Sequence, residues 1–96
     1  MAKIIILDAD RRALRATREQ LGLSRATLER AAKVGKTYVK RLELGGRAST
    51  EATLFTQLLR VLRQRAEKAE VPAKTKAGLL RVVKRVEQQG KSTAPR

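Results

Sequence analysis

Glycine and proline residues divide this chain into short segments whose apolar spacing suits helices rather than strands. The breaks fall at Gly22, Gly35, the Gly45-Gly46 pair and Pro72. Between most of these breaks, apolar residues recur every three or four positions, which is the repeat of one helix face. Glycine ends helices readily because it adopts a left-handed backbone conformation without a Cβ clash, and proline disfavours a helical residue before it. The pattern predicts a mainly α-helical domain with five helices.

Residues suited to capping precede several of the predicted helices. Their side-chain oxygens accept hydrogen bonds from the free N–H groups of a first helical turn. We expect Asp8 or Asp10 to cap the first helix, Ser24 the second, and Ser49 or Thr50 the fourth. The five helices are expected from Asp8 or Asp10 to Gly22, from Ser24 to about Ala32, over Lys36–Leu44, from Ser49 or Thr50 to about Ala66, and from about Ala73 to Gln89, ended by Gly90.

The core of this fold has to be aliphatic, because the chain has one Phe, one Tyr and no Trp. A chain of 96 residues buries only about 60–65% of its unfolded surface, which suffices for one core. The last helix has a wide apolar face, so it either caps this core or meets a second subunit. We expect residues 1–8 to form a strand or arm, 9–70 the main helical domain, 73–90 the C-terminal helix and 91–96 a disordered tail.

A run of β-branched residues near the N-terminus has strand character. A lone strand leaves its backbone groups unpaired, so it needs a partner. Because the sequence shows no second strand-like run, we expect Lys3–Leu7 to pair with the same strand of a second copy across a two-fold axis. The alternative is an extended arm packed on the helices. Together with the last helix, this predicts dimer contacts at Ile4, Ile5, Ile6, Leu79, Val83 and Val86.

The net charge of +14, from 23 Lys and Arg against 9 Asp and Glu, indicates an anionic partner. The two halves of the chain carry similar charge, so the excess belongs to the folded part rather than to a tail. Nucleic acid is the leading candidate. An anionic membrane surface is second, but one Phe and no Trp provide few of the bulky anchors that such binding needs.

The chain lacks Cys and His, which excludes disulfides, thiol chemistry, the usual zinc sites and histidine acid–base catalysis. We therefore expect no catalytic residue, no cofactor and no metal, and a protein that is not an enzyme. The longest apolar run, Ile4–Leu7, is too short to span a membrane, and Asp8 follows it at once, unlike in a signal peptide. A cytoplasmic, nucleoid-associated protein is expected.

Leu23–Leu44 has the apolar spacing of two short helices joined by a tight turn. The inward positions are expected to be Leu28, Ala32, Val34, Val39 and Leu42. The outward face of the second helix then holds Lys36, Thr37, Lys40 and Arg41. A helix with cations on its free face fits the major groove of DNA, which is wide enough to admit it.

This segment resembles the Cro/lambda-repressor/Xre family of helix-turn-helix repressors. The resemblance runs from about Arg12 to Leu62, and its strongest parts are Leu23-Ser24, the inward apolar pattern, Tyr38–Gly45 and Thr53-Leu54. It implies that Lys36, Thr37 and Arg41 face base edges and that Arg25 meets phosphate. From their positions, Lys40 and Arg47 are further phosphate candidates, and Tyr38 either touches phosphate or packs against the helix start.

Two residues depart from the family pattern. Glu29 stands where members usually have a small residue, and we expect it to widen the helix crossing or to point outward to an Arg. Lys33 stands where members usually have Gly, at a cost of about 1 kcal/mol in a left-handed turn, unless Gly35 takes over the turn. Lys33 and Lys36 also lie at the positive end of a helix dipole, which disfavours cations unless an anion binds there.

The sequence thus predicts a homodimeric, sequence-specific transcriptional repressor that binds an inverted-repeat operator in double-stranded DNA. One alternative is the antitoxin of a toxin–antitoxin pair, which at this charge requires an acidic toxin as its protein partner. Another is an architectural DNA-binding protein, which would bind any duplex with similar affinity, whereas a repressor discriminates by about 10³-fold or more.

Overall fold

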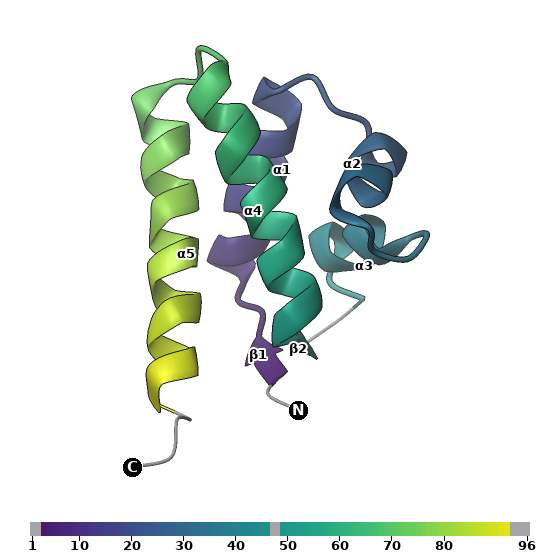
Figure 1. The fold of residues 1–96 in the computed structure, drawn as a ribbon, viewed down its shortest axis with the longest axis vertical. Helices are drawn as coiled ribbons and strands as arrows, with labels where there is room; N and C mark the ends of the chain where they lie inside the picture. Colours follow the sequence, from purple (N-terminus) through teal and green to yellow (C-terminus); the bar gives the residue numbers. More distant parts are fainter. Residues whose placement is uncertain (1–2, 47–48, 93–96) are drawn as a thin grey trace.

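Five helices carry most of the chain, as the glycine and proline pattern predicted. The structure, a computed structural model, describes residues 3–46 and 49–92. The elements in chain order are β1 (Lys3–Ile5), α1 (Asp8–Gln20), α2 (Arg25–Ala32), α3 (Tyr38–Leu44), β2 (Ser49–Glu51), α4 (Ala52–Lys68) and α5 (Ala73–Ser92). In Figure 1, α5 lies on one side, α2 and α3 lie on the opposite side, and α4 and α1 lie between them. The fold class is therefore mainly α with a short N-terminal strand.

One aliphatic core joins all five helices. At its centre is α4, which contacts α1, α2, α5 and both strands. Phe55 and Leu62 of this helix have 0% exposure, and Leu58 has 1%. Each helix adds an apolar face to this one cluster, so the helices stabilise each other by excluding water from the shared core.

The C-terminal helix α5 caps the core, which was one of the two predicted roles for it. Val82 and three residues predicted for dimer contacts, Leu79, Val83 and Val86, are buried inside the single chain. The helix packs mainly on α1 and continues through Gly90, so the prediction that Gly90 ends it is wrong. A single glycine costs a helix only about 1 kcal/mol. No helix in residues 3–46 and 49–92 is long and apolar enough to cross a membrane.

The N-terminal strand has a partner inside the chain. β1 pairs antiparallel with β2, with Ile4 opposite Thr50. The prediction that the chain offers no partner strand is therefore wrong, and so is the assignment of Ser49 or Thr50 as a helix cap, because both belong to β2. β2 consists of three polar residues and is too short to show the alternating apolar pattern by which a strand is recognised in a sequence.

The two predicted dimer residues that flank Ile5 are buried within one chain. Ile4 has 3% exposure and Ile6 has 5%, whereas Ile5 is 61% exposed. The carbonyl oxygen of Ile5 accepts a hydrogen bond from Arg85 of α5 at 3.0 Å. A dimer through the N-terminal strand stays a prediction, but most of the apolar surface proposed for it already serves the chain's own core.

Two of the predicted helix signals have the expected geometry. Ser24 Oγ accepts a hydrogen bond from the backbone N–H of Thr27 at 3.1 Å, and Gly22 follows α1 with φ of +70°. At the start of α1, Asp10 rather than Asp8 accepts the free N–H of Leu7, at 2.8 Å. The Asp10 carboxylate also pairs with Arg85, so the same group that caps α1 fixes α5 to it.

Candidate nucleic-acid interface

Helices α2 and α3 form the two-helix unit that the apolar spacing predicted. Leu28, Ala32, Val39 and Leu42 are all at most 3% exposed, and Val34 packs against the same core from the turn. The unit therefore buries the inward side of both helices and leaves the other side to solvent. Figure 1 shows it at the edge of the molecule, away from α5.

The turn between the helices is left-handed at Lys33, with φ of +58° and ψ of +39°. Two backbone hydrogen bonds end α2 at this residue. The N–H of Lys33 donates to the Arg30 carbonyl, and the N–H of Val34 donates to the Glu29 carbonyl. This bond pair ends many helices, usually with glycine in the left-handed position. Lys33 therefore takes the strained position, whereas Gly35 has no positive φ.

A second left-handed residue, Thr37, sets the start of α3. Its φ is +66°, which a β-branched residue rarely adopts, so α3 begins at Tyr38 and not at the predicted Lys36. Lys36 and Thr37 lie in the turn before the helix, and both are exposed. Strain of this kind costs about 1–3 kcal/mol and persists only where the surrounding structure enforces it.

Glu29 of α2 helps to enforce this geometry. Its side chain is buried, at 7% exposure, and a carboxylate oxygen accepts the backbone N–H of Val39 in α3 at 2.9 Å. The prediction that it points outward to an Arg is therefore wrong, whereas a widened helix crossing stays a prediction. Glu29 provides the cap that Thr37 does not, and it places a negative charge at the start of α3. Cations near this end are therefore less unfavourable than the sequence alone indicated.

A buried carboxylate joins the two-helix unit to α1. Glu43 of α3 has a side chain that is 1% exposed and receives hydrogen bonds from two guanidinium groups. Arg18 of α1 donates to both of its oxygens, from Nε at 2.6 Å and from the terminal nitrogen Nη2 at 3.1 Å. Arg25, at the start of α2, donates from Nε at 3.1 Å. One ion-paired group thus connects α1, α2 and α3.

Sequence reasoning did not identify this network, although one signal was present. Arg18 lies on the apolar spacing of Leu14 and Leu21, where a charged side chain needs a buried partner. The hydrogen bonds to Glu43 raise the pKa of the Arg18 guanidinium, and they outweigh the burial that lowers it. Arg18 therefore stays charged at physiological pH.

Exposed cations cover the outer side of the unit. Lys36, Lys40 and Arg41 are exposed and form no ion pair with any residue in the described part of the chain. A hollow of about 360 Å³ brings Lys40 and Arg41 together with Thr37, Leu44 and Gly46. The structure thus gathers two predicted base readers, Thr37 and Arg41, with the predicted phosphate contact Lys40. An unpaired, exposed set of donors of this kind suits a polyanion.

The other predicted phosphate contacts differ in their surroundings. Arg25 is partly exposed, and its bond to Glu43 fixes its guanidinium at the start of α2. Tyr38 is 3% exposed and its hydroxyl is hydrogen-bonded to that of Thr50 in β2, so the predicted phosphate contact is wrong and its packing alternative applies. Arg47 lies outside the described residues.

Comparison with known proteins assigns the chain to a family. The model of the helix-turn-helix family HTH_3 matches residues 14–65, which is more than half of the 96 residues. Neither the comparison with curated proteins nor the comparison with solved structures gives a match. The matched range contains α2, the left-handed turn, α3, the Glu43 network and most of α4. The chain therefore belongs to the Cro/C1-type, Xre-like helix-turn-helix family of DNA-binding transcription regulators.

Proposed function

We propose that this protein is a sequence-specific transcriptional repressor that binds an inverted-repeat operator as a homodimer. The observation that carries the proposal is the set of exposed, unpaired cations on the outer side of the helix-turn-helix unit. Two copies would place their α3 helices in successive major grooves, about 34–36 Å apart. Occupying promoter DNA is sufficient for repression, and a helix-turn-helix domain is typically not enzymatic.

In this proposal Lys36, Thr37 and Arg41 contact base edges, whereas Arg25, Lys40 and Arg47 contact phosphates. Guanidinium groups form paired hydrogen bonds with guanine, and lysine serves as a point charge beside phosphate. The bond between Arg25 and Glu43 supports this assignment, because it orders one phosphate contact before DNA arrives. Less side-chain entropy is then lost on binding.

The decisive experiment is selection of preferred sites from random duplex DNA, followed by affinity measurements on the selected site and on a scrambled site. The proposal expects an inverted repeat and a preference of about 10³-fold or more for it. A selection that returns no common site overturns specificity and leaves the architectural alternative.

Substitution of Arg41 by alanine tests the assigned roles. Arg41→Ala is expected to lower affinity for the selected site by about 1–3 kcal/mol and to relax preference at one base pair, because a paired guanine contact is lost. Lys40→Ala is expected to weaken both sites equally and to reduce the salt dependence of binding. Arg65→Ala, on the exposed side of α4, is the control. Equal loss on both sites for Arg41→Ala would exclude base reading by this residue.

A further inference from the structure

A second hollow lined by cations lies between α1 and α5. Its volume is about 360 Å³, and it includes no residue of α2 or α3. Its charged lining residues are Arg12 of α1 and Lys74 and Arg81 of α5. In Figure 1, α5 lies on the side of the molecule opposite to α2 and α3. This hollow is therefore separate from the cations around α3.

The floor of this hollow is made of small residues. Three alanines of α1, Ala9, Ala13 and Ala16, line it together with Gly78 of α5. A Cβ at Gly78 would lie 3.6 Å from the Cβ of Ala13, which is an ordinary contact, so the packing of the two helices does not require glycine there. Glycine inside a helix lowers stability relative to alanine. What the missing side chain does provide is an open floor that a ligand can approach closely.

The three cations have no counter-charge in the described part of the chain. None of them forms an ion pair there, and no acidic residue lines the hollow. Arg12 differs in this from the other three arginines of α1, each of which pairs with an acidic residue. Like charges around one hollow repel each other, whereas an anion bound among them is attracted by all three. The hollow therefore fits a ligand with negative charge.

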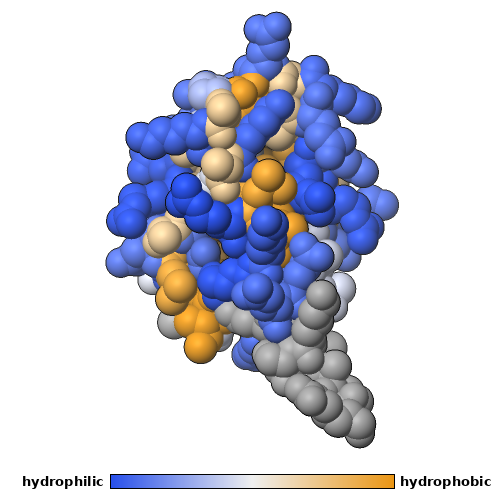
Figure 2. All heavy atoms as spheres, turned by 90° about the vertical axis from the view of Figure 1, so that its left-hand side faces the viewer, coloured by the Kyte–Doolittle hydropathy of each residue, from blue (hydrophilic) through white to orange (hydrophobic). Residues whose placement is uncertain are grey.

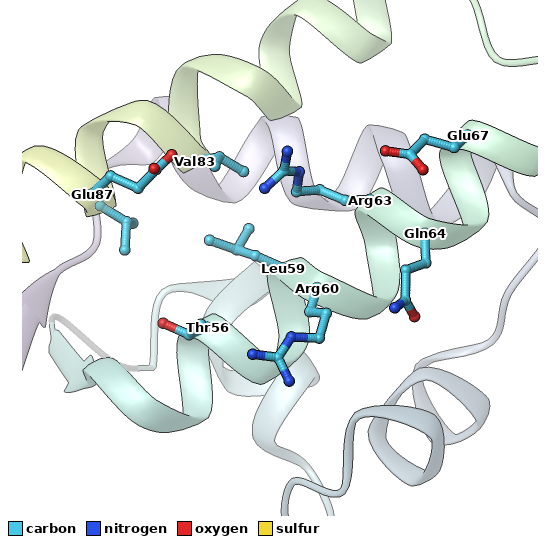
Figure 3. A pocket seen from close by; sticks show the side chains of 9 residues that line it. Thr56, Leu59, Arg60, Arg63, Gln64, Glu67, Val83 and Glu87 are labelled. Carbon is cyan, nitrogen blue, oxygen red and sulfur yellow. The ribbon is translucent and has the colours of Figure 1, made fainter.

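The hollow between α4 and α5 has a different character. It also has a volume of about 360 Å³, but Arg63 and Glu87 both line it, beside the apolar side chains of Leu59 and Val83 (Figure 3). Figure 2 shows hydrophilic side chains over most of the α5 side of the molecule, with small hydrophobic areas between them. Of these two hollows, the one between α1 and α5 has charges of a single sign and no large apolar side chain. It therefore favours an anion without an apolar part.

The arrangement of the cations indicates which anion fits. Lys74 and Arg81 are seven residues apart in α5, which is about 10 Å along a helix axis. Phosphates of one DNA strand follow each other every ~3.4 Å along the duplex axis, so the two cations span about three phosphates. Arg12 adds a third positive charge from α1. An extended chain of phosphates therefore matches the hollow better than a single phosphate group does.

Two other anionic partners fit this hollow less well. A protein commonly holds a nucleobase by stacking it on an aromatic ring, but both aromatic residues of the chain, Tyr38 and Phe55, are buried in the core. Binding to an anionic membrane needs bulky apolar anchors, whereas the apolar side chains that line this hollow belong to alanines. The phosphate backbone of DNA requires neither an aromatic ring nor an anchor.

We propose that the hollow between α1 and α5 binds the phosphate backbone of a second DNA duplex while α3 binds the first. Lys74 and Arg81 contact phosphates along α5, and Arg12 contacts them from α1. Contacts to phosphate carry no sequence information, so the second duplex is bound whatever its sequence. One chain thereby bridges two DNA segments, which is an activity beyond repression. It rests on the proposed function only in that α3 binds DNA, and it requires neither an operator nor a homodimer.

A capture assay with two duplexes of random sequence tests this activity in the full-length protein. One duplex is fixed to beads and saturated with protein, free protein is washed away, and a fluorescent second duplex is then added. Arg12→Gln/Arg81→Gln is expected to keep its binding to the fixed duplex but to capture the second about tenfold less, because two phosphate contacts are lost. The slope of log affinity for the second duplex against log salt should also become shallower by about 2.

Arg65→Gln/Lys68→Gln is the matched control, because it removes the same charge from exposed positions of α4 that line neither this hollow nor the one beside α3. It should capture the second duplex as the wild type does. Glutamine is a good helix former, so these variants should fold, which circular dichroism checks. Lys74→Gln/Arg81→Gln gives an equivalent test that leaves α1 unchanged, should Arg12→Gln prevent folding.

Three results would overturn the proposal. The first is a wild-type chain that captures no second duplex. The second is equal capture by Arg12→Gln/Arg81→Gln and by the control, which would mean that the α3 helix of another copy holds the second duplex. The third is a loss confined to the binding of phosphatidylglycerol vesicles, which would assign the hollow to a membrane surface. Site selection tests sequence recognition at α3 separately, so the failure of either proposal can be told from the failure of the other.

Discussion

The helix-turn-helix unit and the α1–α4–α5 layer differ in how far they depend on buried charge and strained backbone. In the layer, aliphatic side chains such as Leu62 and Val82 pack into the shared core, and one buried carboxylate, that of Asp10, pairs with Arg85. In the unit, the same core is supplemented by two buried carboxylates, Glu29 and Glu43, and by left-handed residues at Lys33 and Thr37. Apolar packing tolerates changes of shape, whereas buried charges and strained backbone each require one partner or one conformation. The comparison teaches that geometry is specified most tightly where DNA is expected to bind.

The largest effect that would test this comparison is the loss of the Glu43 charge. Glu43→Gln is expected to lower the free energy of unfolding by about 3–5 kcal/mol, because it leaves the Arg18 guanidinium buried without its counter-charge. Leu62→Met, an equally conservative change in the layer, is expected to cost less than about 1.5 kcal/mol. Urea unfolding of both variants measures the difference. Similar losses would show that the two regions are equally tolerant.

The pH dependence of this contribution follows from Arg18. Its pKa is raised in the folded state by the hydrogen bonds to Glu43. A raised pKa gives stability that is complete below the unfolded-state value and is lost only as pH rises through the folded one. Arginine stays protonated well above pH 10. Raising the pH to 10 should therefore not reduce the difference in free energy of unfolding between the wild type and Glu43→Gln.

The features that the sequence could predict are local ones, and those that it could not predict are contacts between distant residues. Helices, their ends at Gly22 and Ser24, the inward apolar residues and the strained turn at Lys33 depend on local spacing, which is visible in a single sequence. The bond between Arg18 and Glu43 spans 25 residues, and Glu29 reaches a backbone N–H ten residues away. The paired residues of β1 and β2 are separated by still more of the sequence. No local pattern encodes such contacts.

The family resemblance identified the unit correctly but not the role of its unusual residues. Tyr38 was expected near the helix start, and its burial against Thr50 depends on β2, which the sequence did not reveal. Of the predicted DNA contacts, Lys36, Lys40 and Arg41 have no buried partner and are exposed as expected, although Lys36 lies in the turn before α3 rather than on the helix. Side chains that face solvent depend little on distant contacts, so local reasoning places them well.

A smaller effect is expected at Glu29. Glu29→Ala removes the acceptor for the Val39 N–H and leaves that donor buried, at a cost of about 1–3 kcal/mol. Glu29→Gln keeps an acceptor oxygen in place and should retain most of the stability, which distinguishes the hydrogen bond from the charge. Thermal unfolding of the two variants makes the comparison. If alanine were as stable as glutamine, the cap would contribute nothing to α3.

The smallest effect, and the only one with a positive sign, is expected at Lys33. Lys33→Gly removes the Cβ from a left-handed position and should raise the free energy of unfolding by up to about 1 kcal/mol. Lys36→Gly removes the same charge from a nearby exposed position without positive φ, so glycine gains nothing there and lowers stability through its greater freedom in the unfolded chain. Urea unfolding without DNA compares the two. If both variants lost stability equally, the turn at Lys33 would not be strained, and the unit would be held by its carboxylates and its core alone.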